Sequence, residues 1–433
     1  MPGSAGSDRP NIDLTITPRE SANEQLLAFI RAGGRDETGI VYCLSRKKVE
    51  ATAAWLKRKG LNAIPYHAGF DAKTREAAQK AFINDDGVVL VATVAFGMGI
   101  NRPDVRFVAH VDLPSSVEGY SQEVGRAGRD GLPSRAMMLY GAQDIVQRRR
   151  MIDDGDAEAA VKRTEVAKLN ALVGLAETVG CRRQALLSYF GESHSGNCGS
   201  CDSCRSPAQT ADVSVQAQKF LSAVFRTGQR FGGAYVIDVL RGKTSEKLRR
   251  NGHDKLQLYG IGADLDTASW QSVLRQLIVL EAVQVDHDAY GALKLGDAAR
   301  PILKGEAKVV MRQDRKMRAT EVQASLKASV AAAKEQLPAE DEALFQALRE
   351  ERSALARSQG VPPFIVCTDA TLIAMARIKP VEVLAMGLIP GFGHAKVAKY
   401  GGAFVARISA HLRDDAEIED APEEPVYAPA PGM

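Results

Sequence analysis

Two arginines lie three positions apart in a glycine-rich stretch, YSQEVGRAGRDG (120–131). Arg126 and Arg129 are surrounded by small residues, so both guanidinium groups are free to reach the same anion. A planar guanidinium group pairs two phosphate oxygens at once. An arginine brought to a nucleotide from outside its pocket can stabilise the charge on a transferring phosphoryl group. The same residues would also suit a solvated surface turn, so the pair alone leaves both interpretations open.

Four of the six cysteines lie close together, with the spacing C-x16-C-x2-C-x2-C: Cys181, Cys198, Cys201 and Cys204. Six cysteines in 433 residues do not make a disulfide scaffold. Four thiolates suit Zn²⁺, which takes a closed tetrahedral shell in structural sites. The alternative is a cluster of free thiols in a reducing compartment. His194 is a competing ligand, but the cysteine set is already complete, and the spacing predicts one structural Zn²⁺.

The sequence contains no complete phosphate-binding loop. Such a loop needs the pattern G-x-x-x-x-G-K-[ST], because backbone N–H groups and the lysine hold the phosphates together. Gly242-Lys243-Thr244 has Ile237 where the first glycine is required, and it is interpreted as the turn at the end of a helix. Asp341-Glu342 resembles an acidic nucleotide-binding motif but begins a helix, where carboxylates are stabilised. The chain alone is therefore expected not to bind or hydrolyse ATP.

The first 150 residues alternate apolar runs of strand length with helical stretches. Strands are expected at 39–44, 61–66, 87–93, 105–111 and 136–140, and helices at 45–59, 71–84 and 115–124. Strands that are buried on both sides and alternate with helices indicate a doubly wound parallel sheet. Polar residues follow several of these strands, and ligands bind at the carboxyl ends of the strands in such sheets.

Several segments of this lobe resemble the motifs of one helicase family. VATVAFGMGINRPDVRFVAHVDLP (91–114), followed by residues 120–131, resembles motifs V and VI of superfamily 2 helicases, in the variant of the RecQ family of DNA helicases. IVYCLSR (40–46) is similar to motif IV, YHAG (66–69) to the segment after it, and DRPNI (8–12) to the connector between two RecA-like lobes. The resemblance implies that residues 1–150 are the second lobe. The first lobe, which would bind ATP and Mg²⁺, is absent from this chain.

The resemblance also implies roles for individual residues. Arg126 and Arg129 would face the nucleotide phosphates across the cleft between the lobes, with Gln122 in the same catalytic group. Five residues would couple that cleft to the DNA strand: Thr93, Gly97, Met98, Gly99 and Asn101. Ser45 and Arg46 would contact DNA phosphates.

Two further units follow the lobe. Residues 151–210 begin as a charged helical stretch that runs to about Gly180, and CRRQALLSYFGE (181–192) with the cysteines resembles the RecQ zinc-binding subdomain. In residues 211–306, helices are expected at 215–227, 234–240 and 268–280, before a hairpin with strands near 283–286 and 292–295. Helices followed by a hairpin indicate a winged helix, which docks DNA. The pattern fits a domain for protein contacts almost equally well. The resemblance to the family's winged helix favours the DNA-binding interpretation. Trp270 is expected to lie in the core.

The remaining residues divide into three parts. Residues 307–337 are charged and alanine-rich and are interpreted as a linker. Residues 338–412 resemble the HRDC domain, an accessory module that binds single strands, with Thr368 or Asp369 capping a helix. Lys396 and Lys399 follow a glycine turn that either presents N–H groups to a DNA phosphate or only connects two helices. The acidic, Pro-rich tail, 413–433, is expected to be disordered.

Composition excludes few classes of protein. A net charge of +3 is too small to identify a partner, so any surface for nucleic acid must be local. No apolar run approaches the roughly 20 residues of a membrane helix, and no signal peptide is recognisable. A cytoplasmic, nucleoid-associated protein without membrane contact is therefore expected.

The leading hypothesis is the C-terminal part of an ATP-dependent 3′–5′ DNA helicase of repair and recombination. Its partners would be single-stranded DNA, duplex junctions and a separate first lobe. The alternative is a non-catalytic DNA-binding or regulatory protein derived from such a helicase. An RNA helicase fragment is disfavoured by the zinc and winged-helix modules.

Overall fold

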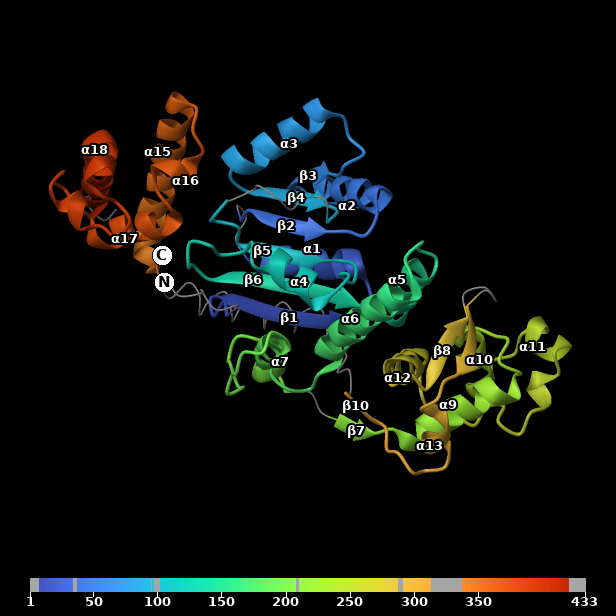
Figure 1. Ribbon diagram of the computed structural model, residues 1–433. Helices are drawn as coiled ribbons and strands as arrows, with labels where there is room; N and C mark the ends of the chain where they lie inside the picture. Colours follow the sequence, from blue (N-terminus) through green and yellow to red (C-terminus); the bar gives the residue numbers. More distant parts are fainter. Residues whose placement is uncertain are drawn as a thin grey trace, which may run out of the picture.

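The computed structural model describes residues 8–33, 37–94, 96, 102–207, 210–286, 291–312 and 337–419. Figure 1 shows a central sheet with the helices α15 to α18 beside the amino ends of its strands. The helices α9 to α13 lie beyond the opposite end, where the strands finish. The zinc-binding module lies next to β1.

The lobe contains a parallel six-stranded sheet in the described residues, with strand order β1-β6-β5-β2-β4-β3. The strands are β1 (Ile12–Pro18), β2 (Gly39–Tyr42), β3 (Asn62–Tyr66), β4 (Val88–Ala92), β5 (Phe107–His110) and β6 (Ser134–Tyr140). This confirms the predicted doubly wound parallel sheet. Strand β1 was not predicted, because its start was interpreted as a connector. Strand β1 pairs with β6, and Ile12 lies opposite Ser134.

Helices cover both faces of this sheet, because alternate residues of a strand point to opposite sides. On one face, α1 (Ala22–Ala32) and α2 (Arg46–Arg58) pack on Val41, Val89 and Val91. On the other, α3 (Ala72–Asn84) and α4 (Val117–Val124) pack on Ile40, Leu90 and Val108. The side chains that cap three of these helices accept hydrogen bonds from backbone N–H groups; they belong to Ser45, Asp71 and Ser116.

The zinc-binding module consists of α5 (Ala142–Asp153), α6 (Ala159–Glu177), α7 (Arg182–Tyr189) and α8 (Asp202–Arg205). The prediction of one helical stretch to about Gly180 was wrong, because the chain breaks between α5 and α6 at residues 154–158. Gly155 and its two flanking aspartates have low helix propensity and explain the break. The module joins the lobe directly, since the N–H of Leu14 donates to the carbonyl of Ser200 at 2.9 Å.

The winged helix contains α9 (Ser214–Arg226), α10 (Gly233–Leu240), α11 (Glu246–Arg250), η1 (His253–Lys255), α12 (Thr267–Val279), β8 (Val283–Asp286), β9 (Ala292–Leu295) and α13 (Ala299–Leu303). Trp270 is fully buried, as predicted, and its Nε1 donates to the carbonyl of Gly262 at 2.9 Å. The unit extends into the expected linker, because β10 (Val310–Arg312) pairs with β7 (Thr210–Asp212). The rest of that linker, 313–336, lies outside the described residues.

The terminal domain contains η2 (Ala339–Asp341), α15 (Glu342–Gln359), α16 (Pro363–Val366), α17 (Asp369–Ile378), η3 (Ala385–Leu388) and α18 (His394–Glu419). Thr368 caps α17, one of the two residues expected there. The buried Arg352 donates from Nη1 to Asp369 Oδ1 at 2.6 Å. Helix α18 continues past 412 into the segment that was expected to be disordered, and this corrects the expected start of the tail. Residues 420–433 lie outside the described residues. In the described parts of the chain, none of the helices combines the length and apolar character needed to cross a membrane.

One buried arginine holds the zinc-binding module together. Arg182 is completely buried; its Nη1 donates to the carbonyls of Leu175, Ala176 and Thr178 at 2.8–2.9 Å, and its other nitrogens pair with Asp202 at 3.1 Å. It therefore satisfies the last carbonyls of α6, which have no partner within the helix.

We predict that Arg182→Ala lowers the free energy of unfolding by about 3 kcal/mol, because it leaves a carboxylate and three carbonyls without their donor. The measurement is the midpoint of urea unfolding, followed by circular dichroism. Arg150→Ala is the matched control, since Arg150 forms an exposed pair with Asp154 and its loss should leave the midpoint essentially unchanged. Equal midpoints for both variants would contradict the prediction.

Candidate functional site

The four cysteines converge on one point. Their Sγ atoms all lie within 4.8 Å of one another, and those of Cys198 and Cys204 are 4.0 Å apart. A tetrahedral Zn²⁺ with Zn–S bonds of about 2.3 Å holds its sulfurs roughly 3.8 Å apart, so the residues fit the ion. Cys181 and Cys201 are buried where α7 and α8 begin. The prediction of a structural zinc site is therefore confirmed.

The surroundings shift the pKa values of the cysteine thiols in opposite directions. Burial raises the pKa of Cys181, but hydrogen bonds from Gln184 and Cys198 outweigh it and bring the pKa down to about 7. Burial raises the pKa of Cys201, and a bound cation supplies the charge that favours its thiolate. His194 is engaged elsewhere, since its Nδ1 accepts from the N–H of Gly196 at 2.9 Å.

The arginine turn, residues 125–131, connects the end of α4 to β6. Arg9 holds this turn, because its guanidinium donates to the carbonyls of Gly125, Ala127 and Gly128 at 2.7–3.1 Å. Gly128 has a φ of +54°, and a Cβ there would lie 2.5 Å from side-chain atoms of Asn11 and Ser134. The turn is therefore fixed to the segment that precedes β1, and it needs glycine at this position.

Arg126 is the most enclosed of the three predicted catalytic residues. It is half-buried, whereas Gln122 and Arg129 are exposed. The Nε of Arg126 is buried and has no hydrogen-bond partner among the described residues. Burial raises the pKa of Tyr42, and the nearby Arg126 cation opposes that rise. Arg126 thus lies against a neutral phenol, and its Nε is left without a partner in the described part of the chain.

A small polar cluster surrounds this arginine. The Tyr42 hydroxyl donates to the carbonyl of Phe96 at 3.2 Å, and its ring stacks on His110 with centroids 5.2 Å apart. His110 Nε2 lies 2.6 Å from Glu123 Oε2. Sequence analysis missed Tyr42, Glu123 and Arg9. Glu123 lies near the end of α4, and Arg126 follows in the arginine turn.

The predicted site residues lie at opposite edges of the sheet. Helix α4 returns from the carboxyl end of β5 to the amino end of β6, so Arg126 and Arg129 lie at the amino edge. Ser45, Arg46 and Thr93 follow β2 and β4 and lie at the carboxyl edge. The general rule of ligand binding at carboxyl ends therefore applies to only part of the predicted site.

The carboxyl edge offers a helix N-terminus to solvent. Ser45 is exposed and caps α2, accepting from the N–H of Lys48 at 3.3 Å, and Arg46 is exposed at the first position of the helix. A helix N-terminus with an adjacent cation suits a phosphate. Thr93 is half-buried here. The other predicted coupling residues, Gly97, Met98, Gly99 and Asn101, lie outside the described residues.

The two lysines predicted to contact DNA lie on the first turns of α18. Lys399 is exposed, with its Nζ 5.1 Å from the ring centroid of Tyr400, and Lys396 is half-buried. The preceding glycine turn leads directly into α18, since the N–H of Lys396 donates to the carbonyl of Gly393 at 2.8 Å. The turn therefore does connect two elements, and its contact with DNA stays a prediction.

Comparison with known proteins assigns each unit to a family. The helicase conserved C-terminal domain matches residues 21–131, RecQ zinc-binding 142–205, the RQC domain 207–320 and the HRDC domain 341–408. The chain is 41% identical over 407 residues to the ATP-dependent DNA helicase RecQ of Pasteurella multocida, and 42% over 405 residues to that of Haemophilus influenzae. It is 34% identical over 408 residues to the RecQ of Bacillus subtilis.

The fold and its two centres define the C-terminal portion of a helicase: a RecA-like lobe, a zinc-binding module, a winged helix and an HRDC domain. The three relatives align with 93–94% of this chain, and the chain spans 63–66% of their length. The chain belongs to the RecQ family and corresponds to its C-terminal region.

We predict that the purified protein carries one zinc per chain and that Cys201→Ser loses it, with a lower unfolding midpoint, because a structural metal contributes directly to folding. Elemental analysis of protein prepared without chelator measures the metal. Cys43→Ser is the control; Cys43 is buried beside Thr52, outside the cluster, and its loss should leave the zinc in place. Well under one equivalent in the unmodified protein would contradict the assignment.

Proposed function

We propose that this chain is the DNA-engaging, ATPase-completing part of a 3′–5′ DNA helicase of repair and recombination. It would act with a first RecA-like lobe, in the same polypeptide or in another, that holds ATP and Mg²⁺. The observation that carries this proposal is Arg126, with a buried Nε that lacks a partner among the described residues, in a turn fixed by three hydrogen bonds from Arg9.

The arginine turn would act on a nucleotide that the first lobe holds. ATP and Mg²⁺ supply the phosphoryl group and the neutralisation of its charge; this chain supplies donors. Arg126 would stabilise the transferring phosphoryl group, and the exposed Arg129 and Gln122 would contact the phosphates and the interface. Because Arg9 anchors the turn, movement of the connector between the lobes would move the arginines with it.

The opposite edge of the sheet would hold DNA. Ser45 and Arg46 would contact phosphates there, and Thr93 begins the segment that we propose, with Gly97, Met98, Gly99 and Asn101, couples the two edges. The winged helix and the HRDC domain would bind duplex junctions and single strands, with Lys396 and Lys399 as contacts. We propose that the functional units are the lobe up to residue 141, the zinc-binding module 142–205, the winged-helix unit 210–312 and the HRDC domain 337–419, and that the protein acts at the nucleoid in the cytoplasm.

We predict that DNA binding weakens steeply with salt, because contacts to phosphates release counterions. Titration of a fluorescent partial duplex at several salt concentrations gives the slope of log K against log salt. Arg46→Ala should reduce its magnitude by about one. Arg58→Ala, an exposed arginine at the far end of α2, should leave the slope unchanged. A flat salt dependence would exclude phosphate-mediated binding.

We also predict that the chain alone does not hydrolyse ATP and that a first lobe from a close relative restores DNA-stimulated hydrolysis. An arginine supplied to a bound nucleotide contributes about 10³–10⁵ in rate, so Arg126→Ala and Arg129→Ala should each abolish the gain. The assay is phosphate release from the mixed lobes.

Both variants should keep their zinc and their DNA affinity, and Arg150→Ala, on exposed α5, should behave as the unmodified chain. ATP hydrolysis by the chain alone that survives both substitutions would overturn the proposal.

A further inference from the structure

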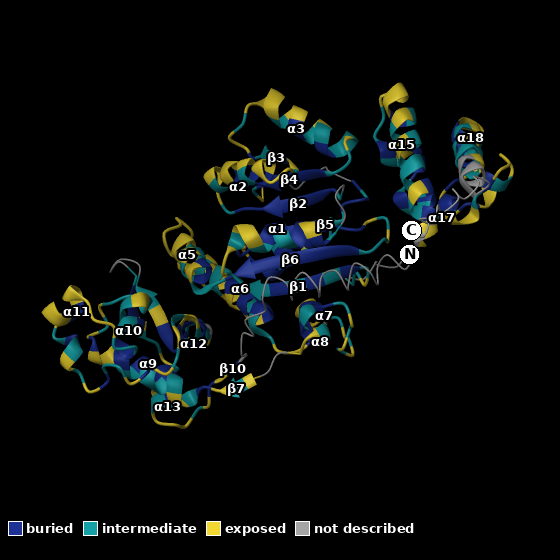
Figure 2. Cartoon of the chain, turned by 180° about the vertical axis from the view of Figure 1, so that it is seen from behind, coloured by how far each residue is buried: buried dark blue, intermediate teal, exposed yellow. Residues whose placement is uncertain are grey.

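The HRDC domain lies against the amino edge of the lobe's sheet. Helices α15 and α17 stand beside this edge in both views of the molecule (Figures 1 and 2). Two polar contacts join the parts: Ser353 Oγ donates to Asp86 Oδ2 at 3.4 Å, and Arg349 Nε lies 3.6 Å from the same oxygen. Asp86, just before β4, is thus shared by two side chains of α15.

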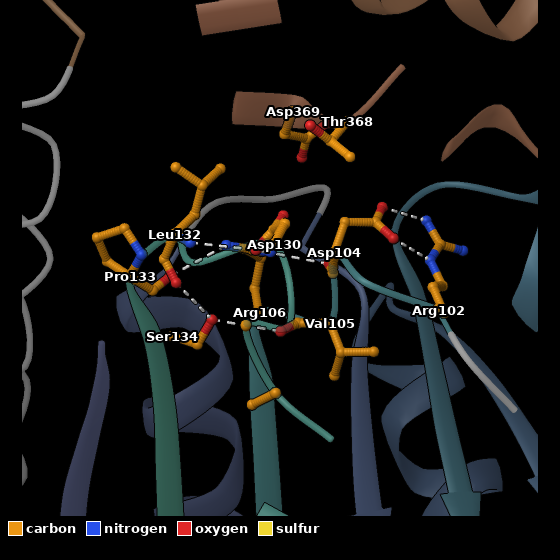
Figure 3. Close-up of polar contacts among 12 residues, drawn as sticks. Arg102, Asp104, Val105, Arg106, Asp130, Leu132, Pro133, Ser134, Thr368 and Asp369 are labelled. Carbon is orange, nitrogen blue, oxygen red and sulfur yellow. Dashed lines mark hydrogen bonds and ion pairs between the residues drawn. The ribbon is translucent and has the colours of Figure 1, made fainter. Parts of the chain in front are cut away.

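A second region of complementary charge lies at the start of α17. Figure 3 shows Thr368 and Asp369 above the loops that precede β5 and β6. In these loops, Arg106 donates from Nη2 to both carboxylate oxygens of Asp130, at 2.6 and 2.5 Å. Burial raises the pKa of Asp369, but the cations of Arg352, Arg349 and Arg106 outweigh it and bring the pKa to about 2. Arginines of both domains therefore stabilise this buried carboxylate.

The interface is built to be reversible. The two contacts at Asp86 are polar, and the Arg349 and Asp86 side chains keep 15% and 24% of their exposure. Pairs of this kind are weak individually and are screened by salt. Asp86 also retains a partner within the lobe, since Arg102 Nη2 lies 3.1 Å from its Oδ1. If the domains separated, Asp86 would therefore still have Arg102 as its counter-ion.

We propose that the HRDC domain docks reversibly on the amino edge of the lobe through Arg349, Ser353 and Asp369, and that the docked domain competes with the first lobe for this edge. The competition rests on the proposed function; the docking does not. Asp130, which faces Asp369 through Arg106, is the residue directly after Arg129. The docking contacts and the arginine turn thus share one edge, and only an undocked domain leaves it open to a nucleotide-bearing lobe.

Docking is tested on the chain alone by X-ray scattering and by hydrogen exchange at low salt. Arg349→Glu places a carboxylate against Asp86, and Ser353→Glu does the same independently. Each should increase the radius of gyration and speed exchange in residues 85–88 and 102–106, and high salt should do the same to the unmodified chain. Arg349→Lys keeps a cation opposite Asp86 and should leave both measurements close to those of the unmodified chain.

Arg407→Glu is the matched control. Arg407 is an arginine of the same domain that pairs within that domain with the exposed Glu350, so its reversal should change neither measurement. Circular dichroism confirms that each variant is folded. Unchanged scattering and exchange in both Arg349→Glu and Ser353→Glu, or equal changes in Arg407→Glu, would overturn the docking.

Competition is tested by titrating a labelled first lobe from a close relative into each chain. Arg349→Glu should bind it at least about fivefold more tightly than the unmodified chain, since a coupling between two sites typically changes affinity by about that factor or more. Equal affinities would overturn the competition. Absence of binding to either chain would contradict the proposed function and the competition. The docking is decided separately, by scattering and hydrogen exchange on the chain alone.

Discussion

Two consecutive buried arginines hold the lobe and the zinc-binding module together. Arg182 satisfies the end of α6 and Asp202, and Arg183 donates to the carbonyls of Arg9 and Ile12 and to Asp8, at 2.7 Å in each case. Five planar donors on one guanidinium can satisfy several carbonyls that no helix or strand would otherwise pair. The zinc ligand Cys181 directly precedes these arginines, so the zinc site positions the backbone from which they extend. Metal, β1 and the segment that anchors the arginine turn therefore form one rigid unit.

This unit would link the chemistry that we propose at one edge of the sheet to the DNA that we propose at the other. Arg9 is held between Arg183 and the arginine turn, so the turn cannot move independently of the zinc-binding module. The parallel strands separate the arginine turn at the amino edge from Ser45 and Arg46 at the carboxyl edge. A shift of the whole lobe relative to a first lobe would displace both edges together. The zinc is thus structural, yet it stabilises the geometry on which the arginines depend.

Many of the arginines form ion pairs and hydrogen bonds within the fold rather than with ligands. Arg102, Arg135, Arg182, Arg183 and Arg352 are buried and pair with carboxylates or carbonyls. Burial of an unpaired charge is costly, so each of these side chains is matched within the fold. The net charge of +3 therefore says little about DNA. Among the exposed cations, Arg46 and Lys399 carry the proposed recognition, and charged contacts also join the HRDC domain to the lobe.

Local chemistry in the sequence determined the zinc ligands, the parallel sheet, the helices and hairpin of residues 211–306 and the cap at Thr368. Each depends on spacing, periodicity or a side chain beside its own helix. The tertiary structure alone decided that residues 12–18 form a strand, because β1 pairs with β6 far along the chain. It also decided that Arg126 lies against Tyr42 and that α15 contacts Asp86. Such contacts join segments that are distant in sequence, and no local pattern records which buried donor will meet which acceptor.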